Sequence, residues 1–273
     1  MNEQNRKALI IGCGIAGPAI ALLLKRAGIE SEIYEARTTP EGYILSLSCN
    51  GMGVLKDLSL DNPVFKEGSP VSNSIIWNGK GKHLGEVPLE GAGEIKSVFI
   101  KRVPLGMILS EEAVRQVITV EWGKKLQGIE VTKQHSVIAT FQDGTTASGD
   151  LLIGCDGVHS RTRHFIDPAA PGAVYTGLMN SGGYTLGLNL PPTSETIHFI
   201  FGKRAFFGYH VRSSGEIYWF VNYLQAEEPA RGALEGITSE ERKQRLLELF
   251  RGAQPFIRNI IGAAETTFPD FPS

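Results

Sequence analysis

The sequence predicts an α/β protein in which a parallel βαβ domain is interleaved with a mixed or antiparallel β-sheet domain. Three observations carry this prediction. The N-terminus reads as strand, glycine-rich turn, helix and strand; hairpin turn signals then interrupt the chain; and residues 175–224 have the pattern of antiparallel strands. A chain of 273 residues with 42% hydrophobic content is long enough to bury the core of such a fold.

The N-terminal βαβ unit is the clearest element. Residues 8–11 form an apolar run typical of a buried parallel strand. A helix is expected over residues 15–27, with Gly28 in the position that follows a helix end. Residues 31–34 resume a strand that ends at Glu35.

The next elements alternate between helices and strands. A short helix is expected over residues 50–58, a strand over 97–100, and a helix from Pro104 to Val117, because proline suits a first helical turn. Asn78-Gly79 predicts a two-residue hairpin turn, and Asp143-Gly144 predicts another within the strand-rich stretch 126–153.

The C-terminal half predicts a larger sheet followed by a helix. The aromatic residues of 206–220 alternate between two faces, and most are expected in the core. Thr238 and Glu241 form a capping box for a helix that ends near Gly252.

Composition excludes several classes of protein. The formal net charge is −2, from 27 basic and 29 acidic residues, so neither a disordered tail nor a nucleic-acid binder with a basic surface is expected. The three cysteines and six histidines show no disulfide framework and no metal-ligand spacing. Three glycines and Pro18 interrupt the apolar stretch 8–24, so no membrane span and a cytoplasmic location are expected.

A G-x-G-x-x-G motif lies between the first strand and the first helix, the context of a Rossmann-like dinucleotide site. Gly12 permits the tight turn, Gly14 lets a pyrophosphate approach the backbone, and Gly17 lets helix and strand pack closely. The helix N-terminus, at Ile15 and Ala16, offers free N–H groups to phosphate. Glu35, 18 residues after Gly17, is placed to accept both ribose hydroxyl hydrogens.

A second motif resembles the fingerprint of a known family. Residues 150–163 read DLLIGCDGVHSRTR, a strand followed by G-x-D-G, a serine and two arginines. This resembles the D-G motif of the group A flavoprotein monooxygenases, the single-component aromatic hydroxylases. Glu35-Ala36-Arg37, Asn50-Gly51 and Arg102 with Leu105 and Leu109 follow in the family's order.

The resemblance implies that the dinucleotide is FAD. Gly12, Gly14, Ile15, Ala16 and Gly17 would face its pyrophosphate, and Glu35 its adenosine ribose. Arg37 and Arg102 would lie near the pyrophosphate and ribityl chain, Leu126 would contact adenine through its backbone, and Asp156-Gly157 would sit beside the pyrophosphate. Arg161 and Arg163 would assist NAD(P)H recognition. From the residues alone, Arg37 also reads as a solvated strand-end residue, and Arg102 as an ion-pair partner of Glu111 or Glu112.

The resemblance also implies domains and an activity. Residues 1–72 and 98–170 would form the FAD-binding domain, and residues 73–97 and 171–273 the substrate domain. NAD(P)H would reduce FAD, and reduced flavin with molecular oxygen would form a C4a-hydroperoxide that hydroxylates a small organic, cyclic or aromatic substrate. No catalytic side chain is predicted, because the cofactor carries the chemistry.

One family fingerprint, a G-D strand-to-helix turn after the substrate sheet, has no counterpart in these 273 residues. A chain lacking that C-terminal segment is therefore expected. Another FAD-dependent oxidoreductase of the same superfamily and a non-catalytic FAD-binding remnant stay open as alternatives. The substrate, the choice between NADH and NADPH, and the oligomeric state do not follow from the sequence.

Overall fold

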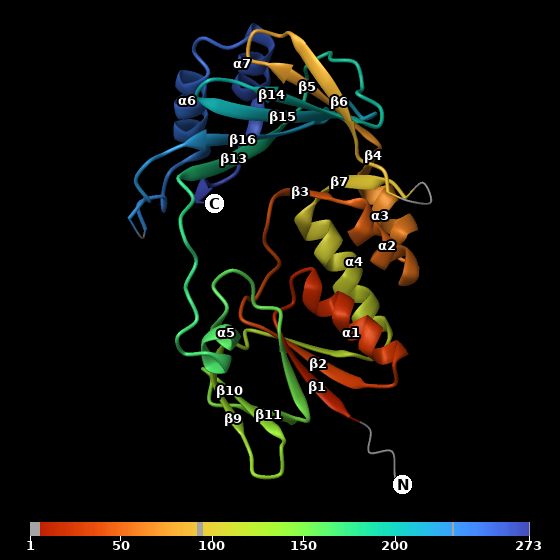
Figure 1. Ribbon diagram of the computed structural model, residues 1–273. Coiled ribbons are helices and arrows are strands. Elements are labelled where there is room, and N and C mark those ends of the chain that lie inside the picture. The colour runs from red at the N-terminus through yellow and green to blue at the C-terminus, as the bar shows by residue number, and fades with distance from the viewer. Residues whose placement is uncertain (1–5, 92–94, 231, 273) are drawn as a thin grey trace. The chain divides into compact units, whose positions relative to one another are not determined.

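The computed structural model describes residues 6–91, 95–230 and 232–272, and the chain forms two compact units (Figure 1). Both units are discontinuous in sequence. Unit 1 comprises Met1–Gly42, Val54–Glu67 and Lys101–Ala173, and unit 2 comprises Tyr43–Gly53, Gly68–Ile100 and Val174–Ser273. Residues 43–53, 68–72 and 98–100, which the sequence placed with the first domain, cluster with unit 2, and residues 171–173, which it placed with the second, cluster with unit 1. The physical reason is strand pairing, because β3 (Ile44–Leu47) and β4 (Ser69–Val71) both flank β7 (Ser97–Lys101) in one small sheet.

Unit 1 is built on a four-stranded parallel sheet in the order β12-β1-β2-β8. Its strands are β1 (Lys7–Ile11), β2 (Glu30–Glu35), β8 (Thr119–Trp122) and β12 (Leu151–Gly154). The chain runs outward from β1 through β2 to β8 and then returns to the other side of β1. The strand order therefore reverses between β1 and β12, the position where open α/β sheets bind ligands at the carboxyl ends of their strands.

The two faces of this sheet have different covers. Leu9, Ile11 and Tyr34 pack with the antiparallel sheet β11-β10-β9, and Tyr34 stacks on Phe141 with ring centroids 4.7 Å apart. That sheet comprises β9 (Leu126–Val131), β10 (Val137–Phe141) and β11 (Thr146–Gly149). Successive strand residues point to opposite faces, so Ile10 faces the other way, toward the start of α1. The helices that lie entirely in unit 1 are α1 (Ala16–Arg26), α3 (Asp61–Glu67), α4 (Arg102–Arg115) and α5 (Arg161–Ile166).

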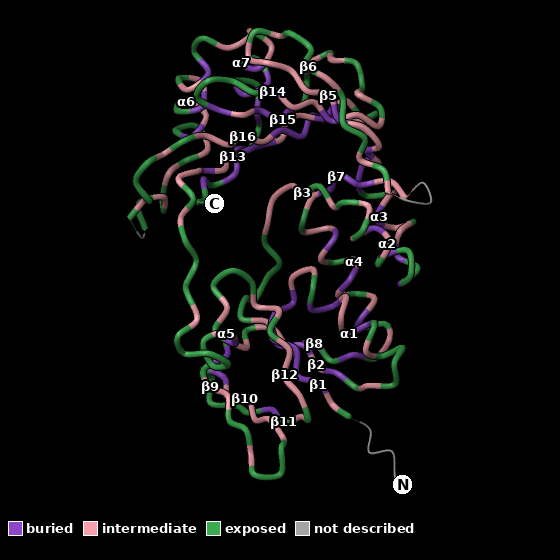
Figure 2. The backbone as a smooth tube through the Cα atoms, in the orientation of Figure 1, coloured by how far each residue is buried: buried purple, intermediate pink, exposed green. Residues whose placement is uncertain are grey.

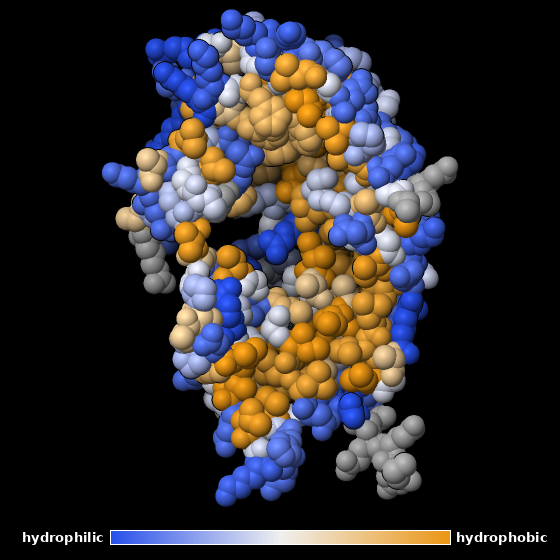
Figure 3. Space-filling view, in the orientation of Figure 1, coloured by the Kyte–Doolittle hydropathy of each residue, from blue (hydrophilic) through white to orange (hydrophobic). Residues whose placement is uncertain are grey.

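Burial follows the position of each strand in the sheet. Residues 8–11 of the central strand β1 are buried, whereas residues 151–153 of the edge strand β12 are only half-buried (Figure 2). In the space-filling view, apolar side chains gather over α1 and α4 on the visible face of unit 1 (Figure 3). Leu23 of α1 and Met107 of α4 are both exposed hydrophobic residues.

Unit 2 contains the large sheet, in the order β17-β13-β16-β15-β14-β5-β6, with β18 also paired to β13. The pairing of β14 with β5 is parallel, and its other neighbouring strands pair antiparallel. The strands are β5 (Asn73–Asn78), β6 (His83–Pro88), β13 (Leu178–Thr185), β14 (Thr196–Phe201), β15 (Ala205–Val211), β16 (Ile217–Leu224), β17 (Ala264–Thr267) and β18 (Phe271–Pro272). Helix α2 (Cys49–Asp57) begins in unit 2 and ends in unit 1.

The aromatic residues of this sheet alternate between faces, as the sequence predicts. Phe207 and Trp219 are fully buried and belong to the core cluster formed with α6 (Ser239–Leu249) and α7 (Pro255–Gly262). Tyr218, next to Trp219 in the chain, instead joins Phe99 in a second cluster. The sheet is therefore packed on both faces within unit 2.

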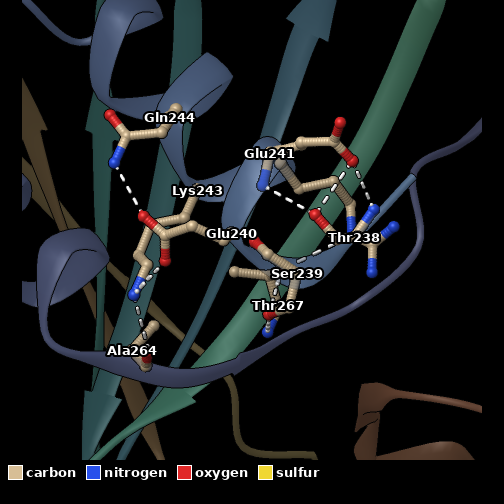
Figure 4. Close-up of polar contacts among 9 residues, drawn as sticks. Thr238, Ser239, Glu240, Glu241, Lys243, Gln244, Ala264 and Thr267 are labelled. Carbon is tan, nitrogen blue, oxygen red and sulfur yellow. Dashed lines mark hydrogen bonds and ion pairs between the residues drawn. The ribbon is translucent and has the colours of Figure 1, made fainter.

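The start of α6 has the predicted capping box (Figure 4). The Glu241 backbone N–H donates to Thr238 Oγ1 at 3.2 Å, and the Thr238 N–H donates to Glu241 Oε2 at 2.8 Å. Ser239 fixes the same turn to β17 by accepting a hydrogen bond from the Thr267 N–H at 3.0 Å. The helix ends at Leu249, before the predicted end at Gly252.

The first predicted hairpin turn is longer than expected. β5 ends at Asn78 and β6 begins at His83, because the Asn78 side-chain oxygen accepts hydrogen bonds from the N–H groups of Lys80 and Lys82, each at 2.9 Å. Helices α3, α5 and α7 were not predicted. Within the described ranges, no helix is long and apolar enough to cross a membrane.

Candidate functional site

The turn after β1, residues 12–17, is called the glycine turn here, and two of its glycines are required by packing alone. Gly12 has φ +108°, and a Cβ on it would lie 2.4 Å from the Cys155 carbonyl oxygen, in the turn after β12. A Cβ on Gly17 would lie 1.9 Å from the Gly12 carbonyl oxygen. Both distances are impossible for a real side chain, so only glycine allows β1, β12 and α1 to approach this closely.

The glycine turn leads directly into the N-terminus of α1, where the side chain of the cap residue does not compete for the free N–H groups. Ile15 occupies the cap position and makes no side-chain hydrogen bond there, and the first turn of α1 contains no acidic residue. The first N–H groups of a helix have no partner within the helix, and the helix dipole places partial positive charge at that end. This arrangement suits an anion such as phosphate.

Glu35 closes the other side of the turn from the end of β2. Its Oε2 accepts a hydrogen bond from the Cys13 N–H at 2.7 Å, and its Oε1 accepts one from the Arg37 N–H at 2.9 Å. An ionised carboxylate offers about four acceptor positions, so each oxygen retains capacity for a hydroxyl donor. Burial, and then the charge of Glu35, raise the pKa of the Cys13 thiol to about 12. Cys13 is thus a protonated packing residue rather than a redox centre.

These groups surround an open hollow of about 440 Å³, part of it continuous with solvent. We call it the unit 1 hollow. The side chains and backbone that line it come from the glycine turn, the segment after β2, α4 and the end of β8: Cys13, Gly14, Ile15, Glu35, Arg37, Thr39, Pro40, Glu41, Arg102, Val103, Gly106, Ser110 and Trp122. The sequence predictions Gly14, Ile15, Glu35, Arg37 and Arg102 therefore lie around one space.

The two arginines of the hollow differ in their partners. Arg37 forms an ion pair with Glu41 at 3.2 Å, and both side chains are mostly exposed. Arg102 begins α4, where its charge opposes the helix dipole, and its guanidinium has no carboxylate partner among the described residues. Glu112, the alternative partner considered from the sequence, instead binds Arg115 at 2.6 Å and Gln116 at 2.6 Å. Of the two described arginines that line the hollow, Arg102 is consequently the one whose charge is not already paired.

Asp156 lies where the strand order reverses, but its carboxylate is used by its own loop. It accepts hydrogen bonds from Ser160 Oγ at 2.6 Å and from the N–H and hydroxyl of Thr162 at 3.0 and 3.1 Å. Burial raises the pKa of Asp156, but these hydrogen bonds outweigh burial and hold the pKa below its ordinary value. Gly157 follows with φ +80°. The carboxylate thus holds the loop that packs against Gly12.

The two arginines after Asp156 donate hydrogen bonds to backbone carbonyls, one of which belongs to Leu126. Arg161 Nη1 donates to the Leu126 carbonyl at 2.6 Å, and Arg163 Nη2 donates to the Val158 carbonyl at 2.7 Å. Leu126 itself is buried at the start of β9 and is absent from the lining of the unit 1 hollow. Its predicted contact with adenine remains a prediction.

Several residues that line the hollow were not predicted from the sequence. Trp122 is the last residue of β8. Parallel strands place their carboxyl ends at one edge of the sheet, so this residue could have been predicted if β8 had been recognised as a parallel strand. Gly106 and Ser110 lie on the face of α4 that lines the hollow. Tertiary packing determines which face of the helix this is. In the part of the chain that the structure describes, no three His, Cys, Asp or Glu residues are grouped to hold a metal ion.

The sequence of this chain resembles those of known proteins. Residues 5–259 match the family described as FAD binding domain. The chain is 31% identical over 211 residues to a FAD-dependent urate hydroxylase of Mycolicibacterium vanbaalenii, which covers 72% of this chain and 52% of that protein. It is 25% identical over 251 residues to the aurachin C monooxygenase/isomerase of Stigmatella aurantiaca, which covers 89% of this chain and 62% of the relative.

The fold also matches a solved structure. The crystal structure of Klebsiella pneumoniae HpxO complexed with FAD and uric acid aligns with a TM-score of 0.83 and 24% identity, over 99% of this chain and 68% of that chain. At this identity the likeness is one of fold. The present chain spans about half of the first curated relative and about three fifths of the second.

Proposed function

The chain belongs to the family of FAD-dependent monooxygenases that carry this FAD-binding domain, and from this premise we propose that unit 1 holds FAD in its hollow. The observation that carries the proposal is the combination around that hollow of an uncapped helix N-terminus, an acceptor carboxylate and an arginine that has no acidic partner among the described residues. We further propose that NAD(P)H, molecular oxygen and a small cyclic organic compound are the other reactants.

The donor set fits the two polar parts of an adenine dinucleotide. A Cβ on Gly14 would stand 3.6 Å from Arg102 Nη2, so the missing side chain leaves a space bounded by backbone on one side and a guanidinium on the other. Phosphate oxygens match both kinds of donor. Glu35, at the end of β2, has the free acceptor positions that ribose hydroxyls require.

Each residue has a distinct task in this proposal. The glycine turn and the start of α1 bind the pyrophosphate, Arg102 neutralises part of its charge, and Glu35 orients the adenosine ribose. Asp156 holds the loop against Gly12 rather than touching the ligand directly. When bound, FAD supplies the electron transfer and oxygen activation that protein side chains do not provide.

The experiment has two stages. Purified protein is first titrated with FAD, and binding is followed by quenching of flavin fluorescence and by equilibrium dialysis. A chain that binds no added FAD would overturn the proposal. NADH or NADPH oxidation is then measured with panels of cyclic substrates under ¹⁸O₂. Incorporation of one labelled oxygen atom into product supports the monooxygenase, whereas substrate turnover without label supports another FAD-dependent oxidoreductase.

A further inference from the structure

The segment after β2 contains a glycine that the proposed function does not use. Gly42 has φ +141° and lies in unit 1, directly after Glu41 of the hollow lining. A Cβ built on Gly42 would be 2.5 Å from Cδ of Arg102 and 3.0 Å from both its Cβ and its Cγ. Real Cβ atoms do not approach other atoms within 3.0 Å. The aliphatic stem of Arg102 therefore fills the space that a side chain at position 42 would occupy.

The other end of the same arginine points to the glycine turn. Arg102 Nη2 is the nearest atom to the position of a Cβ on Gly14, at 3.6 Å. The stem is thus confined at Gly42, and the guanidinium lies beside Gly14. Arg102 is the first residue of α4, so its Cα is fixed by the helix, and contact along the stem restricts the remaining rotamers.

We propose that Gly42 is a positioning residue: it forms a slot that holds the Arg102 guanidinium against the glycine turn, ready for a phosphate of the cofactor. This inference rests on the proposed function, in which Arg102 binds the FAD pyrophosphate. A free arginine side chain loses rotamer entropy when it binds, and confinement before binding reduces that cost. Any side chain at position 42 displaces the stem of Arg102 and moves its guanidinium away from the glycine turn.

The test is a double-mutant cycle in FAD affinity, with Gly42→Ala, Arg102→Ala and the double variant. Loss of one charge-assisted contact is expected to weaken FAD binding by about tenfold or more in Arg102→Ala. Gly42→Ala should weaken it to a similar extent, and the double variant should stay within about twofold of Arg102→Ala, because both substitutions remove the same contact. Wild-type affinity in Gly42→Ala, or two losses that multiply in the double variant, would overturn the inference.

Gly28→Ala is a control for alanine at a positive φ where no neighbouring atom is displaced. Gly28 also has a positive φ, +74°, but no atom lies within 4 Å of the position of its Cβ. It therefore reports backbone strain without displacement of a neighbour. FAD affinity in Gly28→Ala should stay within about twofold of wild type. An equal loss in Gly28→Ala and Gly42→Ala would assign the effect to strain and overturn the slot.

A measurement without FAD separates this inference from the proposed function. The Arg102 Nε–Hε group, assigned in ¹⁵N spectra from its absence in Arg102→Ala, should show a restrained side chain in wild type and in Gly28→Ala, and a mobile one in Gly42→Ala. Equal mobility in wild type and Gly42→Ala would overturn the slot even if FAD binds. If no variant binds FAD, the proposed function fails and the spectra alone decide the inference.

Folding provides a second readout in case Gly42→Ala is unstable. Arg102→Ala removes Cγ and Cδ and with them the contact at 2.5 Å, leaving only the Cβ at 3.0 Å. The double variant should therefore fold and melt closer to Arg102→Ala than Gly42→Ala does to wild type. A double variant that is as unstable as Gly42→Ala would show that the alanine is rejected for another reason, and the inference would fail.

Discussion

The Glu35 carboxylate accepts a hydrogen bond from the backbone N–H of Cys13 at 2.7 Å, across the gap between the ends of β2 and β1. The same carboxylate accepts the Arg37 N–H at 2.9 Å. Glu35 therefore does two things: it fixes the glycine turn before any ligand arrives, and it keeps acceptor capacity for a ribose. A variant at this position should disturb both.

Glu35→Ala should weaken FAD binding by about tenfold to a hundredfold, because hydrogen bonds to a charged acceptor contribute about 1.5–3 kcal/mol. Glu35→Gln, which retains one acceptor oxygen, should fall between Ala and wild type. Fluorescence titration with FAD measures both variants. Unchanged flavin occupancy in Glu35→Ala would remove this residue from the binding site.

Arg37→Ala should change FAD affinity by no more than about threefold, much less than Arg102→Ala. The reason is that Arg37 is already paired with Glu41 and is mostly exposed, and exposed ion pairs contribute about 0–1 kcal/mol. The same titration compares the two variants. If Arg37→Ala loses as much affinity as Arg102→Ala, then Arg37 leaves Glu41 to bind the ligand.

Cys13 should resist alkylation at pH 8.5 in the folded protein. Its pKa is raised to about 12, first by burial and then by the charge of Glu35, so on the order of one thiol in a few thousand is ionised at that pH. Iodoacetamide labelling followed by peptide mass spectrometry measures the extent of reaction, with the denatured chain as the reference. Labelling of folded Cys13 at the denatured rate would contradict the burial on which its pKa depends.

Local sequence signals predicted the glycine turn, α1, the strand that ends at Glu35 and the capping box at Thr238. Each of these depends on residues a few positions apart, where backbone geometry leaves little choice. Gly17 is the clearest case, because the atom that excludes a side chain there is the carbonyl oxygen of Gly12, in the same turn. These features can be predicted from the sequence because each depends on a steric or hydrogen-bonding requirement between residues that are close in the chain.

Contacts between distant segments were not predictable in the same way. Trp122 enters the hollow only because β8 lies next to β2, and Gly42 meets Arg102 only because α4 begins beside that segment. The pairing of β3 and β4 with β7 likewise places in unit 2 residues 43–53, 68–72 and 98–100, which were predicted in the first domain. One sequence contains no direct signal for such non-local pairings.

Gly17→Ala should lower the melting temperature and weaken FAD binding together. A Cβ at this position would lie 1.9 Å from the Gly12 carbonyl oxygen, so α1 must move away from β1, and overpacking of this kind costs about 1–3 kcal/mol. Gly252→Ala is the control, because nothing lies within 4 Å of the position of its Cβ. Equal melting temperatures for Gly17→Ala and wild type would mean that α1 shifts without cost.

Asp156→Asn should destabilise the protein by roughly 1 kcal/mol at pH 7, a value reduced for partial exposure of the carboxylate. The pKa of Asp156 is below its ordinary value of about 3.9 in the folded state: burial raises it, but the hydrogen bonds from Ser160 and Thr162 outweigh burial. Ionised Asp156 therefore contributes stability above the unfolded-state pKa, and this contribution is lost as pH falls through the folded-state pKa. The stability difference between wild type and Asp156→Asn should consequently shrink below about pH 4.

Urea unfolding of wild type and Asp156→Asn, followed at pH 7 and at pH values down to the acid limit of the fold, measures this difference. Asp57→Asn serves as the control, since Asp57 is exposed at the end of α2 and makes no side-chain hydrogen bond among the described residues. It should be as stable as wild type throughout. A difference for Asp156→Asn that stays constant with pH would show that the amide, rather than the lost charge, causes the destabilisation, and that ionised Asp156 does not hold the loop against Gly12.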